Sequence, residues 1–223
     1  MTRRRTLTSL RWFARRLRRD TGGVSLIEFS FITPVLLLLG LGGSEVAYMS
    51  TVNMQVSQIA LSLADNASRL GQTDNSSVTP TITEADIDSI MSGAIRQGQG
   101  IELGAKGRII LSSLEYDSVT GKQYIHWQRC RGSLGRESAY GDDGTRNGLG
   151  ASSIAGVGQA GEQIVAAPGS AVMVAEVYYE YDTIISDVVT GAPVFRQEAV
   201  FAIRDDRNLG PGVTGTAGGS ACS

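Results

Sequence analysis

Residues 22–45 read GGVSLIEFSFITPVLLLLGLGGSE, and this stretch decides the architecture of the chain. The 20 residues from Val24 to Gly43 include a single charged residue, Glu28. A helix that rises about 1.5 Å per residue would cross a hydrocarbon core of about 30 Å over such a length. Pro34 removes one helical hydrogen bond, which membrane helices tolerate. The stretch therefore predicts a transmembrane helix.

Basic residues are concentrated on one side of this span. Eight of the 20 Lys and Arg residues precede position 20, whereas the chain from Thr21 onward carries 12 basic and 21 acidic residues, a net charge of −9. No Lys or Arg lies between Arg19 and Arg69. The positive-inside rule then predicts a cytoplasmic N-terminus and a C-terminal bulk across the membrane. Nucleic-acid binding by the arginine-rich arm is disfavoured, because the apolar span follows it directly.

The helix is expected to continue beyond the span. Apolar residues recur at helical spacing and form one amphipathic face, and Gly71 ends the helix after Leu70. These apolar residues are Val46, Met49, Val52, Val56, Ile59 and Leu63. The face must be buried, either against the chain's own sheet or against a neighbouring subunit.

Glu28 is unusual for its position. An acidic side chain in a span costs a few kcal/mol and commonly marks a functional residue, although near the membrane edge it could simply reach the headgroups. Gly22 and Gly23 close the basic leader. Cleavage between Gly23 and Val24 would place Glu28 at the fifth position of the mature chain.

A basic leader ending in glycine, then small and apolar residues, then Glu28 and Phe29, resembles the type IV prepilin signal. The wider stretch from Asp20 to Glu45 resembles the TadE-like family of tight-adherence pilus assembly proteins. The matching features are Asp and Gly before the span, Glu-Phe near its start, Pro34 further on and an acid at its far end. Beyond this stretch only Ala-Glu-Val-Tyr-Tyr-Glu-Tyr at 175–181 is similar.

The resemblance implies a minor pilin or pseudopilin that takes part in assembling a tight-adherence (Flp-type) type IV pilus. It implies a bacterial inner-membrane protein with one span and a periplasmic C-terminal domain. The implied partners are a prepilin peptidase that cleaves between Gly23 and Val24, other pilins, inner-membrane components of the assembly machine and membrane lipid. Glu28, followed by Phe29, would serve subunit assembly by pairing with the new α-amino group of a neighbouring subunit.

The outer part of the chain reads as an α+β domain. Thr81 to Glu84 predicts a capping box that opens a short helix ending near Gly98, with Ile87, Ile90, Met91 and Ile95 on one face. Strand-like runs at 108–116 and 123–130 are joined around Gly121, and two longer runs at 171–181 and 192–204 are linked through Gly191. We expect a mainly antiparallel four-stranded sheet packed on the long helix, in a pilin-like plan.

Cys130 and Cys222 are the two cysteines of the chain. In a domain outside the cytoplasm they favour a disulfide that ties down the glycine-rich tail, although two free thiols remain the alternative.

The sequence offers no catalytic constellation, cofactor motif or metal set, and we expect no enzyme and no nucleic-acid partner. His126 reads as a structural or solvent-facing residue and not as a general base. Asp142-Asp143-Gly144 reads as a turn, because it lacks the ligand spacing of a calcium loop.

The expected domains are a leader (1–23), a transmembrane helix (24–45), an amphipathic extension (46–71) and an extracytoplasmic domain (72–223). One alternative is a signal-anchored cell-envelope protein with an extracytoplasmic binding domain. Another is an exported enzyme with a cleaved signal, since Thr2 to Arg5 is similar to a twin-arginine leader. That reading needs a cleavage site beyond the span, and Ala64-Asp65-Asn66-Ala67 is a poor one.

Overall fold

The computed structural model describes residues 12–13, 15–19, 22–71, 79–150, 152–158, 161–184, 193–204, 206–216 and 220–222. The chain divides into two compact units, Met1–Tyr48 and Met49–Ser223. The four domain boundaries expected from the sequence stay predictions.

The long helix predicted around the apolar stretch is present. α2 runs from Val24 to Ser68, with Pro34 inside it, and ends two residues before the expected Leu70. Gly71 follows with φ +79°, a left-handed conformation that glycine adopts without strain. The first part of α2 is long and apolar enough to cross a membrane, and its most apolar window is not buried by the rest of the chain. The residues up to Tyr48 belong to the first unit and those from Met49 to the second.

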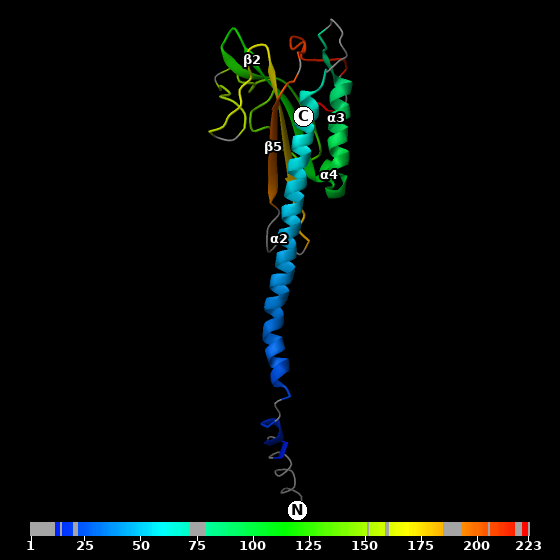
Figure 1. Cartoon of the computed structure of the whole chain (residues 1–223), viewed down its shortest axis with the longest axis vertical. Coiled ribbons are helices and arrows are strands. Elements are labelled where there is room, and N and C mark those ends of the chain that lie inside the picture. Colours follow the sequence, from blue (N-terminus) through cyan, green and yellow to red (C-terminus); the bar gives the residue numbers. More distant parts are fainter. Residues whose placement is uncertain are drawn as a thin grey trace, which may run out of the picture. The chain divides into compact units, whose positions relative to one another are not determined.

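The second unit contains the predicted four-stranded sheet (Figure 1). Its strands are β2 (Gly107–Asp117), β3 (Lys122–Arg131), β4 (Ala171–Glu180) and β5 (Val194–Ala202). The order is β3-β2-β4-β5, and every neighbouring pair is antiparallel. Gly121, with φ +70°, turns the β2–β3 hairpin as expected. Gly191, the expected link between β4 and β5, lies outside the described residues.

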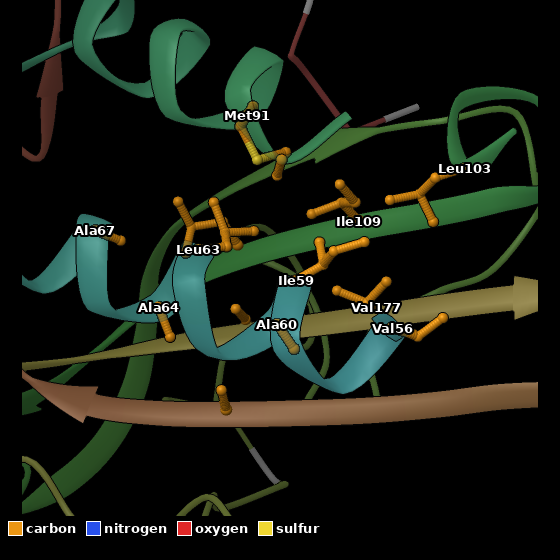
Figure 2. Packing of buried hydrophobic residues seen from close by; sticks show 14 of the residues in the cluster. Val56, Ile59, Ala60, Leu63, Ala64, Ala67, Met91, Leu103, Ile109 and Val177 are labelled. Carbon is orange, nitrogen blue, oxygen red and sulfur yellow. The ribbon is translucent and has the colours of Figure 1, made fainter. Parts of the chain in front are cut away.

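The second part of α2 packs on one face of this sheet (Figure 2). Val56, Ile59 and Leu63 lie on α2 and are at most 1% exposed, and they face Ile109 of β2 and Val177 of β4. The chain's own sheet therefore buries the amphipathic stripe, which decides between the two occupants left open by the sequence. Val46 does not belong to the buried stripe, because it is exposed.

α3 (Glu84–Gln97) covers the same face beside α2, and its N-terminus corrects one prediction. The capping box is formed by Thr83 and Asp86, not by Thr81 and Glu84. Thr83 Oγ1 accepts from the Asp86 amide, and the Thr83 amide donates to the Asp86 carboxylate. The helix begins later because Ile82–Thr83 forms strand β1, which pairs in parallel with β6 (Val213–Thr214). Ile87 and Met91 are buried as predicted, and the C-cap is Gly98.

Two short helical elements that the sequence did not predict follow α3. A 3-10 turn, η1 (Gln99–Ile101), and α4 (Leu103–Lys106) connect α3 to β2. Leu103 is fully buried, and it lies so close to Gly98 that a side chain at Gly98 would collide with it.

The glycine-rich segment after β3 covers the opposite face of the sheet. It contributes Val157 and Ala166 to a second buried cluster with Leu114, Ile125 and Val174. The side-chain amide of Gln123 binds this segment at Ala166: its nitrogen donates to the Ala166 carbonyl, and its oxygen accepts from the Ala166 amide. The sheet is thus buried on both faces, and the loop is part of the core.

Candidate functional site: the start of the long helix

The predicted cleavage position lies at the beginning of α2. Gly22 and Gly23 form a turn, and the Gly23 carbonyl accepts the amide of Ile27 at 3.1 Å in the first helical turn. Gly23 and Val24 are both exposed. A Cβ at Gly23 would meet no atom within 4 Å, so the fold itself does not require glycine there.

Glu28 and Phe29 lie one turn further along α2, and both are exposed. Among the described residues, the side chain of Glu28 has no hydrogen-bond or ion-pair partner. Large apolar side chains surround it along the helix, including Leu26 and Phe31, which are 73% and 76% exposed. An unpaired carboxylate in such a surface is costly in lipid, so it needs a partner from outside the chain or access to the headgroups.

Pro34 modifies the same part of the helix. It offers no amide hydrogen to the Ser30 carbonyl. The hydroxyl of the preceding residue, Thr33, donates to a different carbonyl, that of Phe29, at 2.6 Å. Leu26, Ile27, Phe29, Ser30, Thr33 and Pro34 line a shallow hollow on this side.

The second acid of the motif has a different environment. Glu45 is only 3% exposed and has interaction partners within the chain. The sequence pattern grouped Glu28, near the start of the span, with Glu45 at its far end, whereas the structure exposes Glu28 and buries Glu45.

The predicted disulfide between Cys130 and Cys222 is present and closes a sequence separation of 92 residues. The tail is held by further contacts next to it. The Cys130 amide donates to the Ser220 carbonyl, and the fully buried Ser220 hydroxyl binds Asp88 of α3. Arg131 donates to both Asp88 and Ser220. The last described residues therefore fasten α3 to β3.

Glu176 is a buried carboxylate whose role the sequence analysis missed. It lies on β4 with no exposed surface and accepts from the Ser138 hydroxyl, the Ala139 amide, Tyr178 and Arg196. Because these donors satisfy the charge, Glu176 can stay buried. An acid inside the apolar run of β4 was the available sequence signal.

His126 lies beside Glu115, with Nδ1 at 2.9 Å from the carboxylate. This hydrogen bond raises the pKa of His126, while burial opposes the shift. Burial raises the pKa of the neighbouring Tyr124 to about 12, and the charge of Glu115 adds to the effect. Tyr124 and His126 thus both contact the carboxylate of Glu115.

Asp142 forms the expected turn. One of its carboxylate oxygens accepts the amides of Gly144, Thr145 and Arg146. These bonds, that of Arg146 first, lower the pKa of Asp142. Within the described part of the chain, no group of three or more His, Cys, Asp or Glu side chains is placed to hold a metal ion.

Comparison with known proteins identifies no relative. No family model matches the sequence, and neither a curated protein nor a solved structure matches the chain.

Proposed function

We propose that this chain is a minor pilin or pseudopilin of the TadE-like type, which takes part in assembling a tight-adherence type IV pilus. It is anchored in the bacterial inner membrane by α2, with its basic leader in the cytoplasm and its disulfide-bonded domain in the periplasm. A prepilin peptidase removes the leader between Gly23 and Val24.

The observation that carries this proposal is the state of Glu28. It is the one charged residue between Val24 and Gly43, it is exposed, and it has no partner among the described residues. A new α-ammonium group on a neighbouring subunit would neutralise it where water is scarce. A subunit without this ion pair would keep an unpaired charge in lipid. The ion pair between Glu28 and the α-ammonium group therefore favours one register of neighbouring subunits.

Three further features support the proposal. The arginine leader and the absence of Lys and Arg up to Arg69 favour a cytoplasmic N-terminus. The disulfide suits an oxidising compartment such as the periplasm. A long N-terminal helix whose second part packs on an antiparallel sheet is the plan of pilins in general.

The test is a Glu28→Ala variant expressed in the native host. We expect normal membrane insertion, because removing a charge favours the span, and a loss of surface pili of tenfold or more. Ser30→Ala is the matched control, since Ser30 is a polar, exposed residue of the same helical stretch. Insertion is measured by alkaline extraction, and pili are counted by electron microscopy.

Unaltered piliation in Glu28→Ala, at normal protein levels, would contradict the assembly role. It would favour the alternative, a signal-anchored cell-envelope protein with a periplasmic binding domain.

A further inference from the structure

Strand β5 leaves one edge of the sheet open. It stands at one end of the order β3-β2-β4-β5. Its odd-numbered residues bond β4, because the Tyr181 amide donates to the Pro193 carbonyl and the Ile203 amide to the Ala171 carbonyl in one continuous register. The even-numbered residues of 194–202 therefore point their amides and carbonyls away from the sheet. Within the described ranges, no other backbone group bonds them.

β5 also lacks the features that protect most exposed edge strands. Such strands are commonly short, or are interrupted by a proline, a bulge or an outward lysine. β5 spans nine residues, contains no Pro or Lys and pairs with β4 without a shift in register. Its one basic residue, Arg196, is bound by the carboxylates of Glu176 and Glu198. The opposite edge strand, β3, differs, because the Asn147 and Ser220 carbonyls bond its outer amides.

One side of α2 forms an apolar surface next to this edge. Asn53 and Asp65 of α2 accept hydrogen bonds from side chains of β5 and of the segment after it, at 2.7 and 2.6 Å. At 3.6 residues per turn, Met54 and Leu61 lie between Asn53 and Asp65 around the helix. These two side chains are 58% and 47% exposed. The flank of α2 towards β5 thus presents two large apolar groups to solvent.

The side chains of β5 itself alternate between two surfaces. Phe195 and Phe201 lie on the α2 face and are only partly buried. The even-numbered residues, among them the exposed Arg196, lie on the opposite face. A further strand would therefore meet apolar surface with every second side chain and a more polar surface with the others. An extended polypeptide is the ligand that satisfies such a row of alternating backbone donors and acceptors.

We propose that the open edge of β5 binds an extended segment of a partner protein, which adds a fifth strand antiparallel to β5. All neighbouring strands of this sheet are antiparallel already. The segment carries apolar side chains at alternate positions, which pack on Phe195, Phe201, Met54 and Leu61. In strand addition, main-chain hydrogen bonds supply the affinity and the alternate side chains supply the specificity.

A second copy of this chain does not fit this edge, a conclusion that rests on the membrane anchor proposed above. α2 runs alongside β5 (Figure 1 and Figure 2). Antiparallel pairing of β5 with β5 of a second copy would therefore direct the two α2 helices oppositely. Two copies anchored in one membrane by α2 do not pair in this way, so the added strand comes from a different protein.

Amide hydrogen exchange of the full oxidised chain in non-ionic detergent micelles, followed by NMR, tests whether the edge is open. We expect the outward amides of Glu198 and Val200 to exchange at least tenfold faster than the ladder amides of Gln197 and Ala199. Equal protection of the two pairs would show that the chain covers its own edge, and would overturn the proposal.

The probe for strand addition is a capped, fluorescent peptide of alternating valine and threonine with a lysine at each end. When its valines face α2, its threonines lie opposite the even-numbered residues of β5, so the threonine amides face β5. We expect saturable binding with a Kd in the millimolar range or tighter, measured by fluorescence anisotropy, and slower exchange of the Glu198 and Val200 amides. N-methylation of the threonines should abolish binding, whereas N-methylation of the valines should leave the Kd within threefold.

Leu61→Lys should weaken probe binding by tenfold or more, because it places a charge on the apolar flank of α2. Val119→Lys is the matched control, since Val119 is a large apolar side chain that is 90% exposed in the turn between β2 and β3. It should leave the Kd within twofold of the parent. Circular dichroism checks that both variants are folded.

Three results with the probe would overturn the proposal. The first is the absence of saturable binding to the folded parent chain, and the second is equal binding of the two N-methylated peptides. The third is a dimer of the parent chain that dissociates when the probe is added, which would replace the partner with a second copy. Leader cleavage and the pili of Glu28→Ala are separate measurements, so this surface and the pilus assignment fail separately.

Discussion

Three glutamates, Glu28, Glu115 and Glu176, differ in the environment of their carboxylates. Glu176 is buried and surrounded by donors, and Glu115 is buried beside His126. Glu28 alone of the three is exposed and has no partner in the described chain. Burial with full hydrogen bonding indicates a structural carboxylate, whereas an unpaired acid in an apolar stretch indicates a contact with something else.

The contact between His126 and Glu115 predicts a pH-dependent stability. The folded pKa of His126 is raised, so the stabilising contribution is complete below the unfolded pKa of about 6.5 and disappears as pH rises through the folded pKa. Relative to the parent, His126→Gln should lose about 1 kcal/mol near pH 5.5 and progressively less towards pH 8.5. Urea unfolding of both chains across this range measures the difference. Parallel pH curves for the two chains would contradict the assignment.

The two edge strands of the sheet, β3 and β5, differ in whether another segment covers their outer amides. The outer edge of β3 is covered, because the Ile125 amide donates to Asn147 and the Cys130 amide to Ser220. On β5, the bonds from Tyr181 to Pro193 and from Ile203 to Ala171 fix which residues face β4. Along two antiparallel strands, residue pairs that exchange backbone hydrogen bonds alternate with pairs that do not. The odd-numbered residues of β5 therefore bond β4, and the even-numbered ones point their amides to the open edge.

Two alanines of β5 test this register. Ala199 is an odd-numbered, buried residue, whereas Ala202 is even-numbered and exposed. Ala199→Pro should cost about 3 kcal/mol or more, since it removes a ladder bond and inserts a ring into the core. Ala202→Pro removes an outward amide only and should cost less than about 1 kcal/mol. Thermal unfolding of the two variants compares them directly, and equal losses would contradict the register.

The disulfide is expected to carry a large part of the stability of the tail. Closing a loop of this length contributes roughly 4 kcal/mol in the chain-entropy model. The double variant Cys130→Ser/Cys222→Ser should lose about that amount, and the parent chain treated with reductant should unfold at the same urea concentration as the variant. An unchanged midpoint in the double variant would show that the contacts of Ser220 hold the tail without the bond.

The elements with a clear period were predictable from sequence. The run from Val24, the amphipathic stripe through Ile59 and the strands on either side of Gly121 each carry a local signal. The cap at Thr83 was misplaced by two residues because β6, more than a hundred residues away in sequence, pairs with Ile82–Thr83. A long-range pairing of two residues leaves no local pattern.

The residues of the candidate sites were likewise predictable only where the local sequence carries a signal. Glu28 and the cysteines were found because their types are conspicuous in their surroundings. The donors around Glu176 come from β4, β5 and the glycine-rich loop, which only the fold brings together. The loop supplies Ser138 and Ala139, and it has no periodic pattern that would predict this contact.

For the molecule as a whole, the apolar surface of α2 before Tyr48 has to be covered. Exposed large side chains such as Leu38 and Leu39, 75% and 69% exposed, are incompatible with water over such a length. A lipid bilayer covers this helix in our account, and neighbouring subunits cover part of it during assembly.

Processing of the N-terminus distinguishes a pilin precursor from a plain signal anchor, because the two classes of protein share every other feature of α2. Mass spectrometry of the protein purified from native membranes measures the mature N-terminus directly. We predict a chain that begins at Val24. A chain that keeps its arginine leader, or one that begins beyond Glu45, would contradict the assignment as a pilin.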